Sequence, residues 1–129
     1  MKEFRNPKNV HAPLGAYTHQ VEVSGGERLL ILSGQVGARE DGSLPDSTLE
    51  QLEVCFDNIL RNLESAGMGV QDLLKLTYFV VGEIDMAKRR EIITAKLQGH
   101  KPCSTFLFVA GLASPAYKVE VEAIASRSG

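Results

Sequence analysis

The stretch LLKLTYFVV at residues 73–81 decides the fold, because its residue types and length are those of a buried strand. Aromatic and β-branched residues favour strands, and nine residues are too few for a typical buried helix. Both alternating faces of this stretch are largely apolar. The sequence therefore predicts a strand inside a sheet that needs cover on both faces.

Two amphipathic helices flank this strand in the sequence. The segment before it opens with Ser47-Thr48-Leu49-Glu50, the pattern of a capping box, and Gly67 is expected to end the helix. Apolar residues recur there at steps of three and four and predict one buried stripe, made of Leu49, Leu52, Phe56, Ile59 and Leu63. The segment after the strand has Asp85 as its predicted cap and Gly99 after its end. Its expected inner side carries Met86, Ile93 and Leu97.

Four further strands are predicted. Residues 17–23 and 28–33 are separated by Ser24-Gly25-Gly26, a turn signal, and are expected to form a hairpin. The second of them is apolar on both faces. Residues 105–109 form the fourth strand of the chain, and residues 117–126 form the fifth, in which apolar and polar positions alternate.

These elements predict a single α+β domain over residues 1–129, with strand and helix order β-β-α-β-α-β-β. We expect one mixed sheet of about five strands with two helices on one face, since two helices cover only one side of a sheet. The other face still carries apolar side chains from two strands. The chain is thus expected to form a closed homo-oligomer, unless loops and aromatic side chains cover that face.

Composition excludes several classes of function. The net charge of −2 argues against non-specific binding of nucleic acid, and the one basic run, Lys88-Arg89-Arg90, is interpreted as solvated charge. Cys55 and Cys103 belong to no C-x-x-C motif, and His11, His19 and His100 lack the spacing of metal ligands, so no metal is expected. No segment has the length of a membrane span, and the first residues lack the apolar core of a signal peptide. A cytoplasmic location is expected.

Four stretches along the chain carry a resemblance to a known family. They are APLGAY at residues 12–17, LSGQ at 32–35, LESAG at 63–67 with the strand that follows, and KPC at 101–103 with VEVEAIA at 119–125. Their order and spacing resemble those of the Rid (YjgF-type) family of reactive intermediate deaminases, which is also labelled endoribonuclease L-PSP. The resemblance spans nearly the whole chain.

The resemblance implies a chorismate-mutase-like fold and a homotrimer with small-metabolite pockets in the clefts between subunits. Family members hydrolyse reactive enamines and imines to a 2-oxo acid and ammonia, and no cofactor is expected. By match to the family, Glu120 would orient the attacking water and the Tyr17 hydroxyl would donate to a substrate oxygen. Ser33, Gly34 and Gln35 match a strand end that faces the cleft. Glycine at such a place permits close approach of a ligand.

Plainer interpretations stand beside these roles. Glu120 is also explained as a strand residue paired with Lys118 or with a neighbouring strand. Tyr17 is also explained by core packing, and Gly34 by a β-bulge. Glu122 lies on the same strand face as Glu120, and a structural or interface role is favoured for it.

One departure from the family pattern bears on function. The family has an arginine shortly after its signature proline, which clamps the substrate carboxylate. Here Pro102-Cys103 is followed by Ser104 and Thr105, which we expect to line the pocket instead. An enzyme of this kind would need another cation, from Lys118 or an adjacent subunit.

Two other functions remain open at this point. One is a non-enzymatic trimer that binds a small ligand or regulates another protein. The other is an endoribonuclease, against which the acidic balance of the chain speaks.

Overall fold

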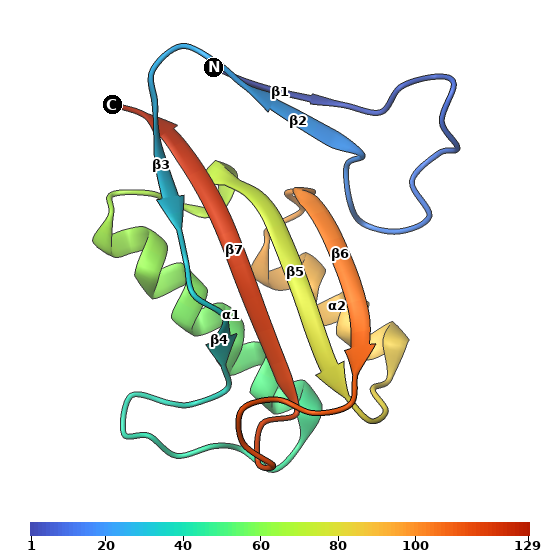
Figure 1. The fold of residues 1–129 in the computed structure, drawn as a ribbon, viewed down its shortest axis with the longest axis vertical. Coiled ribbons are helices and arrows are strands. Elements are labelled where there is room, and N and C mark those ends of the chain that lie inside the picture. Colours follow the sequence, from blue (N-terminus) through green and yellow to red (C-terminus); the bar gives the residue numbers. More distant parts are fainter.

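A computed structural model describes residues 1–129, and its centre is a mixed five-stranded sheet (Figure 1). Strand β5 (Leu73–Val81) lies between β7 (Val119–Ser128), which is antiparallel to it, and β6 (Cys103–Val109), which is parallel. On its far side β7 pairs with β3 (Glu27–Ile31) and with the short β4 (Gln35–Val36). The predicted α+β class with a mixed sheet is confirmed, and the LLKLTYFVV stretch is its central strand.

Both long helices lie behind the sheet on the same face (Figure 1). Helix α1 (Thr48–Ser65) is capped by Ser47, whose hydroxyl accepts from the backbone N–H of Glu50. Helix α2 (Met86–Lys96) is capped by Asp85, whose carboxylate accepts from the N–H of Lys88. Both predicted caps are confirmed. A 3-10 turn (Val70–Asp72) joins α1 to β5.

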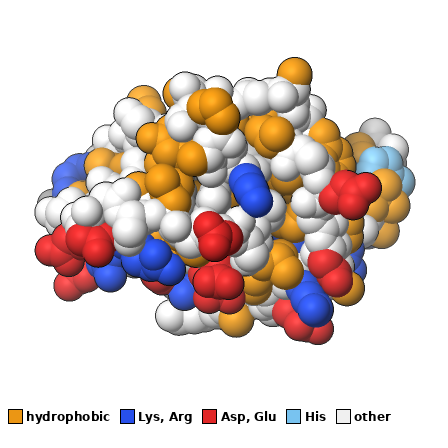
Figure 2. Space-filling view, turned by 90° about the horizontal axis from the view of Figure 1, so that it is seen from below, with side chains coloured by type: hydrophobic (Ala, Val, Ile, Leu, Met, Phe, Trp, Pro, Cys, Tyr) orange, Lys and Arg blue, Asp and Glu red, His pale blue; other side chains and the backbone are white.

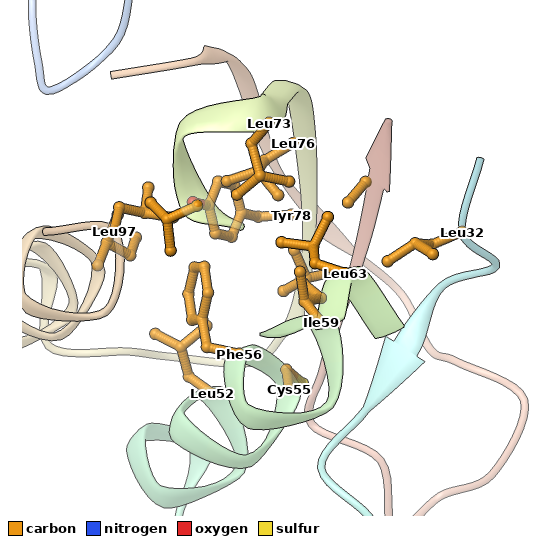
Figure 3. Close-up of a cluster of buried hydrophobic side chains, with 14 of the residues drawn as sticks. Leu32, Leu52, Cys55, Phe56, Ile59, Leu63, Leu73, Leu76, Tyr78 and Leu97 are labelled. Carbon is orange, nitrogen blue, oxygen red and sulfur yellow. The ribbon is translucent and has the colours of Figure 1, made fainter. Parts of the chain in front are cut away.

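The core fills the space between the helices and the sheet (Figure 3). Leu52, Phe56, Ile59 and Leu63 of α1 are buried against the inward side of β5 and β7, as their spacing predicted. Leu49 is only half-buried. Along β7 the inward positions are buried valines and alanines, whereas Glu120 and Glu122 alternate with them and project from the opposite face.

The sheet face away from the helices is uncovered in the single chain and partly apolar. Leu29 and Ile31 of β3 are 63% and 68% exposed, and Phe79 of β5 and Ile124 of β7 are half-buried. Such a face is consistent with the expected self-association.

The predicted hairpin between residues 17–23 and 28–33 is wrong. Strand β2 (Gln20–Val23) pairs with β1 (Lys2–Arg5) in a separate two-stranded sheet, and only β3 joins the main sheet (Figure 1). Gly25 and Gly26 both have positive φ, 76° and 72°, and turn the chain between β2 and β3 without pairing the two strands. The sequence prediction missed β1, a short polar segment.

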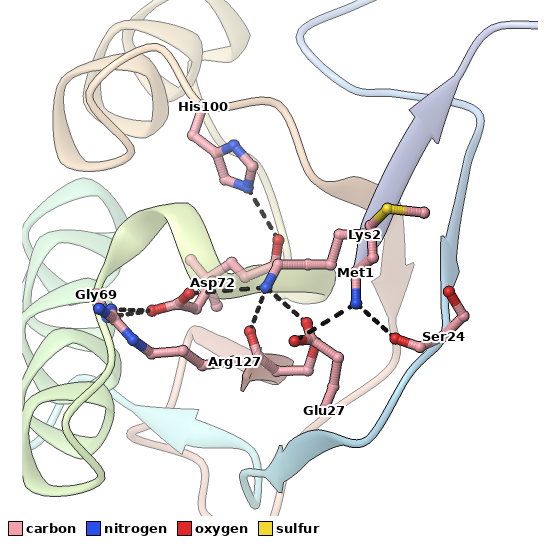
Figure 4. Close-up of polar contacts among 10 residues, drawn as sticks. Met1, Lys2, Ser24, Glu27, Gly69, Asp72, His100 and Arg127 are labelled. Carbon is pink, nitrogen blue, oxygen red and sulfur yellow. Dashed lines mark hydrogen bonds and ion pairs between the residues drawn. The ribbon is translucent and has the colours of Figure 1, made fainter. Parts of the chain in front are cut away.

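A buried polar cluster anchors β1 to the main sheet (Figure 4). Lys2 Nζ donates to Glu27 Oε1 at 3.0 Å and to the carbonyl of Ser126 at 2.6 Å, and lies 3.7 Å from Asp72 Oδ1. Arg127 Nη1 donates to Asp72 Oδ2 at 3.3 Å. The Glu27 side chain is only 5% exposed, so its charge depends on these partners.

Candidate functional site

A cavity of about 300 Å³ lies between α2, β6 and the loop that precedes β2. Eight of its thirteen lining residues are hydrophobic, and none is acidic. The lining consists of Leu14, Gly15, Ala16, Tyr17, Tyr78, Met86, Arg89, Arg90, Ile93, Leu97, Pro102, Ser104 and Phe106. A largely apolar cleft with a few polar groups has the general character of a small-molecule site.

Two of the residues singled out from the sequence line this cavity. Tyr17 enters from the loop, where its hydroxyl accepts from the N–H of Leu14 at 3.2 Å and its ring stands edge-on to His19. Ser104 pairs with Leu76 of β5, so its side chain is on the helix side of the sheet. Tyr17 and Ser104 come from segments far apart in the sequence.

The cavity also holds two arginines that sequence reasoning missed. The guanidinium carbon of Arg89 lies 4.3 Å from the centre of the Phe106 ring, in a cation–π arrangement. Its Nε is buried and has no hydrogen-bond partner, and neither Arg89 nor Arg90 forms an ion pair. Burial lowers the pKa of Arg89 from its ordinary value, although an arginine stays protonated at neutral pH.

The interpretation of Lys88-Arg89-Arg90 as solvated charge is therefore wrong for Arg89. A signal for its placement was present in the spacing. Position 89 lies three residues after Met86 and four before Ile93, on the helix face that the apolar residues define.

A second group of predicted residues gathers around β4. A Cβ atom placed on Gly34 would lie only 2.1 Å from Oε2 of Glu120, so the carboxylate is packed against this glycine. Gln35 pairs with Val121 of β7, and its amide donates to the carbonyl of Ser33 at 3.0 Å. Glu120, Gly34, Gln35 and Ser33 are therefore neighbours.

The two groups do not meet within one chain. Glu120 pairs with Phe79 and Ser104 with Leu76, and their strands lie on either side of β5. With strands about 4.8 Å apart and a rise of about 3.3 Å per residue, their Cα atoms are roughly 14 Å apart. Their side chains also point to opposite faces of the sheet.

Two residues considered for the pocket lie elsewhere. Thr105 faces the uncovered side of the sheet, where its hydroxyl accepts from Lys75 Nζ at 2.6 Å, so within one chain it lies on the opposite side of β6 from Ser104 and does not line this cavity. Lys118 donates from Nζ to the carbonyl of Asp46 and is absent from the cavity. Lys118 of the same chain therefore does not supply the missing cation.

Other reactive groups are set apart from these two regions. Cys55 is fully buried, and burial raises the pKa of its thiol to about 12, which excludes a thiolate nucleophile at neutral pH. No three His, Cys, Asp or Glu side chains come together in a way that would hold a metal ion. No helix is long and apolar enough to cross a membrane. The end of the molecule seen in Figure 2 carries basic side chains interspersed with acidic ones.

Several known proteins are similar to this chain in both sequence and fold. A family model described as Endoribonuclease L-PSP matches residues 8–127. The 2-iminobutanoate/2-iminopropanoate deaminase of Escherichia coli is 31% identical over 124 residues, which cover 93% of this chain and 94% of that protein. A RutC family protein of Aquifex aeolicus is 34% identical over 93 residues, covering 71% and 69% of the two chains.

Two solved structures illustrate the likeness in fold. The Rid-family protein YyfB of Yersinia pestis superposes with a TM-score of 0.87 at 28% identity and covers 96% of this chain and 97% of its own. Escherichia coli TdcF with bound serine superposes with a TM-score of 0.71 at 26% identity, covering 98% and 99%. These matches extend over nearly the whole chain.

Proposed function

The chain belongs to the Rid (YjgF-type) family, and from this premise we propose that it binds a small imine, enamine or related carbonyl metabolite in a site shared between two copies of itself. The cavity of one copy receives the ligand. The Glu120 region of a neighbouring copy closes the cleft and orients a water molecule. The assembly proposed is a homotrimer without a cofactor.

The separation of the two residue groups is the observation that carries this proposal. Tyr17 and Ser104 line a cavity at the β6 edge, whereas Glu120 and Gly34 lie on the other side of β5. One chain cannot bring both groups to one ligand, but a second copy can. The exposed side chains of Leu29 and Ile31 give an apolar surface through which copies would associate.

The proposed chemistry follows from the residue types. The Glu120 carboxylate accepts a proton from water as the water oxygen bonds to the carbon of the C=N group. The same proton then passes to nitrogen, which gives a carbinolamine. The O–H proton of the carbinolamine is transferred to nitrogen as the C–N bond breaks, so that ammonia leaves and the carbonyl forms. The hydroxyls of Tyr17 and Ser104 hold the polar atoms of the substrate in the cavity, and the deaminase of Escherichia coli carries out a reaction of this class by name.

A coupled assay tests the proposal directly. A pyridoxal-phosphate dehydratase supplies 2-iminopropanoate, and its decay is followed with purified wild-type protein and with Glu120→Gln. We expect the variant to lose about a hundredfold in hydrolysis rate, since a positioned general base contributes 10²–10⁴-fold. Glu64→Gln, the same change at an exposed position of α1, serves as the control. A wild-type rate no higher than buffer, or equal rates for wild type and Glu120→Gln, would contradict the proposal.

A second function is favoured by one observation, the serine at position 104. If the family arginine is indispensable for turnover, the same cleft would bind a metabolite without hydrolysing it. A thermal-shift screen that includes L-serine separates the two, because ligand binding raises the unfolding temperature by mass action. A ligand that stabilises the protein and is recovered unchanged would favour the binding function.

RNA cleavage, suggested by the family description, has less support. The chain has a net charge of −2, and the cavity is too small for more than part of a nucleotide chain. Nuclease activity that survives stringent purification and is lost in Glu120→Ala would revive it.

A further inference from the structure

The cavity carries positive charge and no negative charge from its own lining. Arg89 and Arg90 both reach it from α2, and the other lining residues include no Lys, His, Asp or Glu. Neither arginine forms an ion pair with any acidic side chain of the chain. Buried or half-buried arginines usually form ion pairs, so the positive charge in this pocket lacks a negatively charged partner.

Arg89 is the better placed of the two. Its guanidinium carbon lies 4.3 Å from the centre of the Phe106 ring, and its side chain is half-buried, whereas that of Arg90 is exposed. Its Nε is fully shielded and donates to nothing. The guanidinium therefore has no anionic partner, and its terminal N–H groups are the ones left to bind a carboxylate in the cavity.

The guanidinium of Arg89 lies near the part of β6 that carries Ser104. Phe106 lies two residues after Ser104 on the same strand and the same face. Those two Cα atoms are about 7 Å apart. A guanidinium stacked on Phe106 therefore stands beside the place from which an arginine at position 104 would project.

We propose that Arg89 binds the carboxylate of the ligand of this cavity, with the guanidinium supplied from α2 instead of from β6. The inference rests on the proposed function only in taking the cavity as the ligand site. The contact with Phe106 restrains the guanidinium, and the planar fork of its N–H groups matches a carboxylate. Ser104 leaves the room that a second long side chain would fill.

The ligand class follows from these groups. It carries a carboxylate for Arg89, and next to it an oxygen or nitrogen for the hydroxyls of Tyr17 and Ser104. A volume of about 300 Å³ limits it to a small molecule. Short 2-oxo and 2-imino acids meet these requirements.

Binding of pyruvate, measured by calorimetry or by NMR titration, tests the assignment without turnover. The matched probe is pyruvamide, which has the same shape but no charge. We expect wild type to bind pyruvate more tightly than pyruvamide. Arg89→Gln should lose at least about tenfold in affinity for pyruvate and keep its affinity for pyruvamide. Arg89→Lys keeps the positive charge but not the planar fork of N–H groups, so its affinity for pyruvate should lie between those of wild type and Arg89→Gln. Lys88→Gln, an exposed neighbour on the same helix, is the control and should bind as wild type does.

The remaining outcomes would overturn the inference or one part of it. Absence of pyruvate binding by wild type at concentrations up to about 20 mM, or equal affinities for wild type and Arg89→Gln, overturns the inference. If thermal unfolding shows that Arg89→Gln is not folded, Arg89→Lys is compared in its place, and wild-type affinity in that variant overturns the bidentate contact. The Glu120→Gln variant distinguishes failure of this carboxylate site from failure of the proposed hydrolysis. Pyruvate binding that depends on Arg89 together with no hydrolysis in any variant would refute hydrolysis and leave the carboxylate site standing.

Discussion

Gly34 and Glu120 are in such close contact that no side chain fits between them. A Cβ atom at position 34 would stand 2.1 Å from Oε2, 2.6 Å from Cδ and 2.8 Å from Cγ of Glu120. Glycine at this strand end is therefore required for the position of the carboxylate. The proposed role of Glu120 depends on that position.

Gly34→Ala is expected to displace Glu120 and to reduce imine hydrolysis by at least about tenfold, since catalysis by a general base depends on its placement. The overpacking should also destabilise the fold, but by less than the roughly 1–3 kcal/mol of a core site, because the half-buried Glu120 side chain can move. Rates in the coupled assay and urea denaturation measure the two effects. Gly111→Ala, at a position where a Cβ meets nothing within 4 Å, is the control.

The clash itself is isolated by a double-mutant cycle. In a Glu120→Ala background the carboxylate is gone, so Gly34→Ala should cost little stability, and the two changes should be strongly non-additive. Additive effects would mean that the glycine is needed for its backbone and not for room beside Glu120.

Ile31→Glu is expected to abolish self-association. Ile31 is 68% exposed on the uncovered sheet face, and an unpaired carboxylate buried between copies would cost several kcal/mol for each subunit. Sedimentation velocity at micromolar concentration measures the effect, with Val10→Glu, also an exposed apolar position, as the control. A wild-type protein that sediments as a monomer would remove the basis for a shared site.

Glu27 is expected to make the free energy of unfolding depend on pH in the acid range. The hydrogen bond from Lys2 is the largest cause that holds the pKa of Glu27 below its ordinary value of 4.5, against the opposing effect of burial. A lowered folded pKa gives stability that is present above pH 4.5 and is lost as the pH falls through the folded value. Thermal unfolding of wild type and Glu27→Gln between pH 7 and about pH 2.5 should therefore differ most at pH 7 and converge in acid. A difference that is constant over this range would contradict the expectation.

Ser104→Arg is expected to restore pyruvate binding to Arg89→Gln, because a guanidinium from β6 would reach the same cavity as the one removed from α2. Affinity should recover to within about tenfold of wild type. Thr105→Arg in the same background places the charge on the opposite face of the strand and should restore nothing. Equal rescue by both would show that net charge near the cavity matters and not the placement of the guanidinium.

Local patterns in the sequence predicted much of the fold. The two-sided apolar stretch at residues 73–81 predicted the central strand, and Ser47 and Asp85 predicted the starts of both helices. These features are set by a residue's near neighbours. The pairing of β2 with β1 depends on a contact between segments about fifteen residues apart, and the glycine turn after β2 had the same local signature as a hairpin.

The candidate site was predictable only in part for a similar reason. The family resemblance implied that Tyr17, Gly34, Ser104 and Glu120 share one cleft, whereas the single chain brings together only Gly34 with Glu120 and Tyr17 with Ser104. Arg89 was hidden in a run of three cations, where the charge pattern indicates solvent exposure. Only the helical spacing from Met86 to Ile93 distinguishes it from Lys88 and Arg90, and that spacing becomes informative once α2 is seen to face β6 across the cavity.

Complementation between two impaired variants tests most directly whether the cavity and Glu120 act together across copies. Arg89→Gln and Glu120→Gln chains are unfolded together, mixed in equal amounts, refolded and assayed for imine hydrolysis. A site built from two chains predicts recovery of about a quarter of wild-type activity, the share of random interfaces that pair an intact cavity with an intact Glu120. No recovery in mixed assemblies that have formed would contradict the shared site.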